Sequence, residues 1–275
     1  MRYSVPVVLS RLMKARVGMF GVGVSGINNG LSRHYLASIV DRADVVVVRD
    51  KYSANEIIKI RPARTNIRVG VDLALSLDRE SIIKAYGNPR QITRGVGLNV
   101  GLHLESLIRV GVNGYNFTKI ILSELHKLRN CGVNVFIIID HNSSVYEKYG
   151  SIMLEVGCEF PVVHNDNPWL LARELSGLDV VLTSKLHVGI VGYALGCAVF
   201  GVSTHEKTAA FYKLIGRGAY QASYQTAAEH VLSWVRDIGT RNADALNLGS
   251  EFRVDLRNKA LGLLDEIEDF YSGES

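Results

Sequence analysis

The sequence predicts an α/β protein with parallel β-sheets, divided into two domains. Short apolar runs of strand length alternate with amphipathic helical segments along most of the chain, which favours parallel sheets covered by helices on both faces. A length of 275 residues allows one large core or two modest ones. Helix-breaking residues at 87–89 interrupt the alternation, so we place the domain boundary there.

Composition and charge exclude several classes of function. Hydrophobic residues make up 47% and charged residues 21%, which is typical of a globular protein and not of a disordered one. The net charge of +4 is too small and too scattered to indicate nucleic-acid binding. Three cysteines without C-x-x-C spacing, no apolar run of membrane-spanning length and no convincing signal peptide predict a cytoplasmic protein. No histidine has metal-ligand spacing, so no metal is expected.

The first predicted domain covers residues 1–90. Its expected strands and helices alternate along the chain: strands at 16–20, 45–48 and 67–71, and helices at 27–40 and 52–60. Ser53 is the expected N-cap of the second helix. The strand at 45–48 ends in Arg49 and Asp50, which places a cation and an acid at its carboxyl end.

The second predicted domain covers residues 91–240, and residues 241–275 form a polar linker with a terminal helix. The second domain is expected to begin with the segment 95–99, followed by strands at 133–139, 159–163, 180–182 and 198–202. After residue 202 helices dominate, at about 207–215, 226–238 and 254–271. A detached terminal helix of this kind could return to brace the first domain.

Residues 179–211 contain the strongest candidate site. The stretch predicts strand, turn, short apolar helix closed by Gly196, second strand and polar loop. In a parallel sheet, ligands bind at the carboxyl ends of strands, and two such ends follow each other here. Cations, imidazoles and a helix N-terminus together favour an anion, such as a phosphorylated or carboxylated small molecule. The polar residues at these ends are Ser184, Lys185, His187, Ser203, His205 and Lys207.

Three segments resemble the polysaccharide pyruvyl transferase family. The first is A-D-V-V-V-V-R-D-K-Y-S at 43–53, similar to a family strand that ends in arginine and an acid before a serine. The second is S-K-L-H at 184–187, which resembles the family's Arg-Leu-His motif with lysine in place of arginine. The third is A-L-G-C-A-V-F-G-V-S, followed by Lys207 twenty residues after His187.

The resemblance implies a GT-B-like fold, with two Rossmann-like domains facing a cleft. Compared with the family pattern, the first domain of this chain is expected to be shortened. It implies transfer of pyruvate from phosphoenolpyruvate to a sugar of an exopolysaccharide or its lipid-linked precursor, forming a ketal and releasing phosphate without a cofactor. A lipid-linked acceptor would bring the protein into peripheral contact with a membrane. The resemblance assigns Arg49, Lys185 and Leu186 to phosphoenolpyruvate, and His187 and Lys207 to catalysis. Ser184, Ser203 and His205 complete the expected substrate-binding set. The acid or base role of His187 stays open.

Two alternatives remain at this stage. Gly21, Gly23 and Gly26 after the first strand, with Asp50 after the second, form the outline of a dinucleotide fingerprint. This pattern would suit an NAD-dependent oxidoreductase, although a tight strand-to-helix turn explains the same glycines. The shortened first domain instead suggests a truncated, non-catalytic protein that binds phosphosugars.

Overall fold

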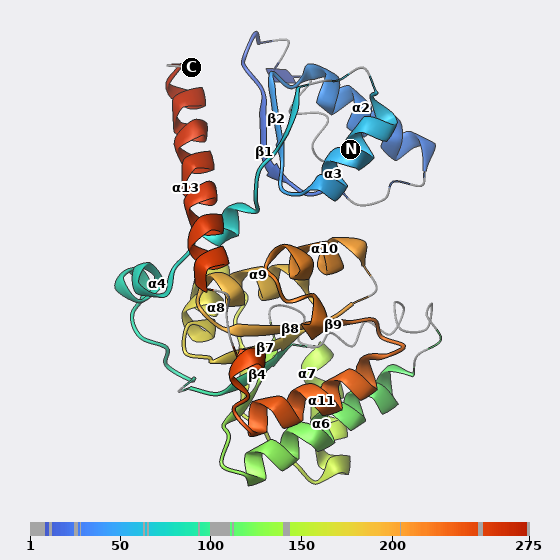
Figure 1. Cartoon of the computed structure of the whole chain (residues 1–275), viewed down its shortest axis with the longest axis vertical. Helices are drawn as coiled ribbons and strands as arrows, with labels where there is room; N and C mark the ends of the chain where they lie inside the picture. The colour runs from blue at the N-terminus through green and yellow to red at the C-terminus, as the bar shows by residue number, and fades with distance from the viewer. Residues whose placement is uncertain are drawn as a thin grey trace. The chain divides into compact units, whose positions relative to one another are not determined.

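The chain forms two compact units, one from Met1–Ser76 with Val254–Ser275 and one from Leu77–Arg253. The computed structural model shown in Figure 1 describes residues 9–10, 13–24, 27, 29–62, 64, 66–92, 94–99, 111, 113–139, 144–203, 205–246 and 250–273. Gly26, one of the three glycines of the possible fingerprint, lies outside the described residues.

The first unit contains a three-stranded parallel sheet in the order β1-β2-β3. Its elements are β1 (Gly18–Val22), α2 (Gly30–Arg42), β2 (Val45–Val48), α3 (Lys51–Ile60), β3 (Ile67–Val69) and a short 3-10 turn (Leu73–Ser76). Helices α2 and α3 cover one face of this sheet (Figure 1). The buried apolar core beneath them includes Val40, Val46 and Ile57.

The terminal helix α13 (Ser250–Ser272) packs on the other face of this sheet. Phe270 lies edge-on to Phe20 of β1 with ring centroids 5.6 Å apart, and Arg68 of β3 pairs with Glu266 at 2.7 Å. Without α13, the second face of a parallel sheet would be exposed to water. The C-terminal helix therefore completes the layer structure of the N-terminal unit.

The second unit contains a six-stranded parallel sheet in the order β6-β5-β4-β7-β8-β9. Its strands are β4 (Val96–Asn99), β5 (Val135–Ile139), β6 (Val162–His164), β7 (Val180–Thr183), β8 (Ala198–Val202) and β9 (Gln221–Ala222). Counted within this unit, the order is 3-2-1-4-5-6, which is that of a doubly wound dinucleotide-type sheet. The chain reverses its direction of winding between β4 and β7, so the topological switch point lies at these two strands.

Helices cover both faces of the larger sheet, as the alternating sequence pattern predicts. They are α4 (Arg79–Tyr86), α6 (Gly114–Asn130), α7 (Ser144–Val156), α8 (Pro168–Leu175), α9 (Leu186–Ala194), α10 (Glu206–Leu214), α11 (Ala227–Gly239) and α12 (Ala243–Leu246), with a 3-10 turn at Gly218–Tyr220. Figure 1 shows α8, α9 and α10 on one face and α6, α7 and α11 on the other. Fully buried strand residues such as Leu98, Ile137 and Phe200 form the core against α6, α7 and α11.

Local capping signals agree with the structure at some helix ends and differ at others. Gly196 follows α9 with φ +90°, so it ends the helix as predicted. Asn167 caps α8, with Pro168 at the first helical position, where its missing N–H costs no hydrogen bond. Asp50, and not Ser53, caps α3, because the Asp50 carboxylate accepts the Ser53 N–H at 2.6 Å. The Ser53 hydroxyl is instead used to accept the N–H of Val24 at 2.9 Å.

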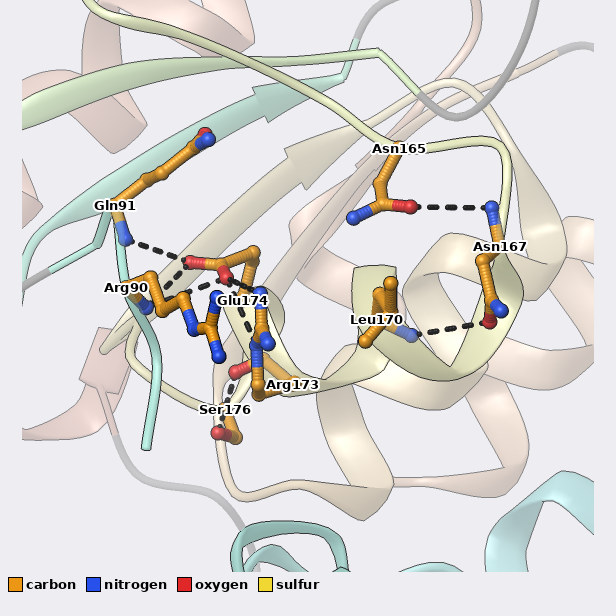
Figure 2. A network of polar contacts seen from close by, with 8 residues as sticks. All are labelled: Arg90, Gln91, Asn165, Asn167, Leu170, Arg173, Glu174 and Ser176. Atoms are coloured by element: carbon orange, nitrogen blue, oxygen red, sulfur yellow. Dashed lines mark hydrogen bonds and ion pairs between the residues drawn. The ribbon is translucent and has the colours of Figure 1, made fainter. Parts of the chain in front are cut away.

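The division into units falls between Ser76 and Leu77, and not near residue 90 as the breakers indicated. The segment after α4 is fastened to the second unit by Glu174, a fully buried carboxylate (Figure 2). Glu174 accepts the N–H groups of Arg90 and Gln91 at 3.1 and 3.0 Å and pairs with Arg173 at 2.6 Å. A buried charge must be paired and hydrogen-bonded, so this network holds residues 90–91 against α8.

No helix among the described residues is long and apolar enough to cross a membrane.

Candidate functional site

The candidate site is built around a buried polar contact at the switch point of the larger sheet. Asn99 ends β4 and Thr183 ends β7, and the Thr183 hydroxyl donates to Asn99 Oδ1 at 2.9 Å. The Asn99 amide nitrogen donates to the Ile138 carbonyl oxygen of β5 at 2.9 Å. Open α/β sheets bind ligands in the crevice at this point, because helices on opposite faces diverge from it. The contact locks the three central strands in register where a ligand would approach.

Helix α9 begins directly after this contact. Thr183 accepts the Lys185 N–H at 2.9 Å, so the sharp turn from β7 into α9 is fixed by the same hydroxyl. Lys185 is the N-cap residue and makes no side-chain cap, and Leu186 is buried as the first helical residue. His187 is the second helical residue and is exposed, whereas Lys185 is half-buried. The first turn of α9 therefore presents a lysine and an imidazole beside backbone N–H groups.

The neighbouring strand β8 repeats the arrangement one position along the sheet. Ser203 follows β8 and is buried, and its hydroxyl accepts the His205 N–H at 3.1 Å. His205 is the exposed N-cap residue of α10, and Lys207 lies half-buried in the first turn. Among the described residues no carboxylate pairs with Lys207. Because β7 and β8 are adjacent parallel strands, both helix N-termini lie at the same edge of the sheet.

Tyr224 contributes to this edge and was not among the residues expected from the sequence. Its buried hydroxyl is hydrogen-bonded to the side chain of Ser184, which follows β7. Burial raises the pKa of Tyr224, and the bond to Ser184 partly opposes this rise. Tyr224 follows β9, a strand of only two residues, and that strand has no sequence pattern long enough to detect. Asn99 was equally unmarked, since one asparagine after a strand also suits a turn.

Arg49 lies in the first unit and is engaged by carboxylates of that unit. Its Nε donates to Asp50 Oδ2 at 3.2 Å and its Nη1 to Asp72 Oδ2 at 3.0 Å. The side chain is only 10% exposed. These ion pairs give Arg49 a structural role within the first unit. That Arg49 also contacts substrate remains a prediction.

The glycine-rich turn after β1 accommodates Arg49. A Cβ on Gly23 would lie 2.5 Å from the central guanidinium carbon of Arg49, so a larger residue here would require the guanidinium to shift. Gly21 has φ +63°, a conformation that favours glycine. Helix α2 begins at Gly30 and not directly after the turn, and the Val24 N–H is already bound to Ser53. These features favour the tight-turn explanation over the dinucleotide fingerprint.

The predicted residues thus fall into two groups. Ser184, Lys185, Leu186, His187, Ser203, His205 and Lys207 all lie at the carboxyl ends of the adjacent strands β7 and β8 in the second unit. Arg49 lies at the carboxyl end of β2 in the first unit. Among the residues that the structure describes, no group of three potential metal ligands comes together.

A cavity of about 670 Å³ lies at the opposite, amino-terminal edge of the larger sheet. Its lining includes Arg79, Asp179 and Arg241, and the helix ends at Gly132, Gly196 and Gly239 border it. Arg79 donates to the carbonyl oxygens of Leu178 and Leu195 at 3.0 and 3.2 Å. Helix C-termini carry partial negative charge, and the Arg79 guanidinium is already bonded to carbonyl oxygens there. The cavity is therefore a poor site for an anion. We therefore place the candidate site at the carboxyl edge.

Several solved structures share this fold at low sequence identity. A putative UDP-N-acetylglucosamine 2-epimerase from Listeria monocytogenes has a TM-score of 0.68 and 11% identity, covering 97% of this chain and 71% of that one. The UDP-GlcNAc 2-epimerase from Neisseria meningitidis, bound to UDP-GlcNAc, has a TM-score of 0.63 and 9% identity, covering 97% and 73%. Anabaena HepE in complex with UDP has a TM-score of 0.57 and 13% identity, covering 98% and 76%. These likenesses confirm two parallel-sheet α/β domains of the GT-B-like kind.

A comparison with curated protein sequences gives no significant match. The sequence profile of one family, described as polysaccharide pyruvyl transferase, matches residues 1–206 of the 275. The matched region contains Arg49 and the 184–187 motif, and it ends one residue before Lys207. The match supports a transferase that moves a pyruvyl group to a polysaccharide, with a sugar or polysaccharide as acceptor. The chain belongs to the polysaccharide pyruvyl transferase family.

Proposed function

We propose that the protein transfers pyruvate from phosphoenolpyruvate to a sugar of a surface polysaccharide or of its precursor, forming a pyruvate ketal and releasing phosphate. One observation carries this proposal: the N-termini of α9 and α10, each with a lysine and a histidine, lie at adjacent strand ends beside the switch point. Two helix N-termini and two cations suit a substrate that carries both a phosphate and a carboxylate.

Charge complementarity explains how each part of the donor would be held. Lys185 and Lys207 supply ammonium groups, and the first-turn N–H groups of α9 and α10 supply directed donors. The departing phosphate gains charge as its bond to the enol carbon breaks, so fixed donors at this edge lower the barrier. The buried Asn99–Thr183 contact fixes the turn into α9 and so holds the donors of that helix in place.

The reaction needs balanced proton movements. Two hydroxyl oxygens of the sugar each form a bond to the enol carbon, and the bond from that carbon to the phosphate oxygen breaks. Of the two hydroxyl protons, one reaches the methylene carbon, which becomes a methyl group, and the other leaves with phosphate. His187 is exposed on the first turn of α9, and an imidazole can donate or accept a proton near neutral pH. We assign these transfers to His187, with Lys207 as its partner in catalysis.

Ser184, Leu186, Ser203 and His205 complete the proposed binding surface. The Ser184 hydroxyl is oriented by Tyr224, and the Ser203 hydroxyl orients the first residue of the α10 turn. Arg49 is proposed as a further substrate-binding residue on the basis of the family motif. Its existing ion pairs with Asp50 and Asp72 require that this role be tested separately from its role in stability.

Phosphate release from phosphoenolpyruvate tests the proposal. The purified protein is incubated with phosphoenolpyruvate and a panel of bacterial polysaccharides and lipid-linked oligosaccharides, and inorganic phosphate is measured. We expect acceptor-dependent release, and a loss of about 10²- to 10⁴-fold in His187→Ala, which is the usual contribution of a general acid or base. His230→Ala is the matched control, because His230 is an exposed histidine on α11, which covers the opposite face of the sheet from α9 and α10.

Three results would contradict the proposal in different ways. Unchanged turnover in His187→Ala would remove this residue from the mechanism. Binding of phosphoenolpyruvate without phosphate release for any acceptor would indicate a non-catalytic protein. A nicotinamide fluorescence change on titration with NADH would point instead to the turn at 21–26.

A further inference from the structure

Two aromatic side chains form an exposed stacked pair on the second unit. The rings of Tyr86 at the end of α4 and Trp169 at the start of α8 are 5.8 Å apart and inclined by only 9°. Trp169 is 46% exposed and Tyr86 is 37% exposed. The second tryptophan of the chain, Trp234, is 3% exposed and packs in the core. Burial of a tryptophan is strongly favourable, so an exposed stacked pair leaves apolar surface available for a ligand.

The pair lies at the same edge of the sheet as the candidate site. Strand β6 ends at His164, and the next residue, Asn165, donates its N–H to the carbonyl oxygen of Ile139 at the end of β5. Helix α8 starts three residues later, so Trp169 stands just beyond the carboxyl end of β6. Strand β6 is separated from β7 by β5 and β4. Three strand spacings amount to roughly 14 Å.

Two carboxamides stand beside the aromatic pair with their nitrogen atoms available. Asn165 Oδ1 accepts the Asn167 N–H at 3.1 Å, and Asn167 Oδ1 accepts the Leu170 N–H at 3.3 Å (Figure 2). Asn167 Oδ1 also accepts the Trp169 N–H at 2.9 Å. The oxygen atoms are thereby fixed, so the amide orientation is fixed as well. Within the described part of the chain neither Nδ2 atom makes a hydrogen bond, and each retains donors for a ligand.

We propose that Trp169, Tyr86, Asn165 and Asn167 form a second sugar subsite that holds the acceptor chain away from the reacting sugar. This inference rests on the proposed function. A pyranose ring has an apolar face of C–H groups, which packs on an aromatic ring, and peripheral hydroxyls, which accept hydrogen bonds from amides. The strand ends that precede the two groups of residues are roughly 14 Å apart, which exceeds a single sugar ring but is spanned by a polysaccharide. The subsite therefore selects for long acceptors over short ones.

Tryptophan fluorescence tests the subsite without requiring turnover. The chain has two tryptophans, so Trp234→Phe leaves Trp169 as the sole reporter while keeping an aromatic ring in the core. The full-length variant is titrated with β-glucan and galactan ladders that run from monosaccharide to hexasaccharide. We expect a saturable change in the Trp169 emission that strengthens with chain length. A flat response for every ladder would overturn the proposal.

Calorimetric titration of the longest oligosaccharide that binds separates the contributions of the residues. We expect affinity about tenfold weaker in Trp169→Ala, which corresponds to about 1.4 kcal/mol, and near wild-type affinity in Trp169→Phe. Tyr271→Ala is the matched control, because Tyr271 is an 84% exposed aromatic residue of the first unit. Equal affinity in Trp169→Ala and wild type would refute the subsite.

The activity assay distinguishes failure of this inference from failure of the proposed function. If both hold, Trp169→Ala raises the KM for a long acceptor, leaves the KM for a short acceptor unchanged and preserves kcat. If fluorescence reports binding but no phosphate is released, the subsite stands and the donor chemistry fails. If phosphate is released and the KM of Trp169→Ala is independent of acceptor length, the subsite fails alone.

Discussion

The two units place cations at the carboxyl ends of parallel strands but surround them differently. Arg49 at the end of β2 has Asp50 and Asp72 within 3.2 Å and is almost buried. Lys207 at the end of β8 has no carboxylate paired with it in the described residues, and it stands at a helix N-terminus. The same placement in a sheet therefore gives a charge neutralised by the protein in one unit and a charge available to a ligand in the other.

The difference shows that a strand-end cation does not by itself indicate a binding site. A strand-end cation is available to a ligand only when no carboxylate from a neighbouring strand end pairs with it. Asp72 follows β3, the strand next to β2, and it pairs with Arg49. One carboxylate, Glu206, lies in the first turn of α10 after β8, but among the described residues it is not paired with Lys207. A ligand that binds Arg49 must compete with two carboxylates already paired with it, and a ligand that binds Lys207 need not.

The largest effect on stability is expected from Arg49→Ala. Its removal leaves Asp50 and Asp72 facing each other with little solvent, and breaking a pair of this kind costs about 3 kcal/mol. Arg61→Ala is the control, since its pair with Asp41 is exposed and contributes at most about 1 kcal/mol. Thermal unfolding combined with hydrogen exchange in β1 and β2 measures both. Equal stability of the two variants would remove the contrast between the units.

Arg49→Lys sharpens the same comparison. Lysine keeps the charge but cannot donate to both carboxylates through a planar fork. If Arg49 also binds the donor, Arg49→Lys raises the KM for phosphoenolpyruvate by more than its modest loss of stability explains. An unchanged KM would assign Arg49 a structural role alone.

An intermediate effect is expected from Thr183→Val in the second unit. The substitution keeps the side-chain shape but removes the hydroxyl that joins Asn99 to the Lys185 N–H, leaving buried polar groups unpaired at a cost of about 2 kcal/mol. Because the same hydroxyl fixes the start of α9, kcat/KM for phosphoenolpyruvate should fall as well. Thr118→Val is the control, since Thr118 is equally buried but bonds only to Gly114 within α6. Matching losses of kcat/KM in both variants would argue against a special role for the switch-point contact.

The smallest effect on stability at neutral pH is expected from the buried Cys197, and this effect grows only at alkaline pH. Burial raises the pKa of this thiol from 9.0 to about 12. Below pH 9 the thiol is protonated in both states, so it adds no pH dependence. Above pH 9 it ionises in the unfolded chain only, so stability falls by roughly 1 kcal/mol per pH unit until the folded thiol ionises. Tyr193, whose pKa burial raises to about 12, adds to this loss above pH 10.

Urea unfolding from about pH 8 to about pH 10.5 checks this expectation, because this range spans the pKa of the thiol in the unfolded chain. Cys197→Ala should flatten the decline in stability of the second unit, and Cys131→Ala should not, because Cys131 is exposed. All three cysteines lie in the second unit, so the first unit should lack this source of alkaline sensitivity. A decline that is identical in wild type and Cys197→Ala would show that other groups are responsible.

Much of the architecture was predictable because strand and helix periods are local. Runs such as 45–48, 133–139 and 198–202 are apolar over strand length, and the structure has β2, β5 and β8 there. The end of the helix after β7, at Gly196, followed from capping chemistry. The short strand β9 could not be predicted, because a two-residue strand has no period. The exact start of α9 could not be predicted either, because the Thr183 hydroxyl accepts the N–H of Lys185, two residues along the chain.

The sequence alone determined which residues stand at strand ends, since this depends on neighbours a few positions away. Only the tertiary structure decided what those residues meet. Asp72 reaches Arg49 across 23 positions, Asn99 reaches Thr183 across 84 and Glu266 of the terminal helix reaches Arg68 across 198. The first two contacts form because folding brings distant strand ends to one edge, where each buried polar group must find a partner. The third is an exposed pair that forms because the terminal helix packs on the first sheet. The local pattern supplied the charges, and the packing of the chain determined which of them are neutralised.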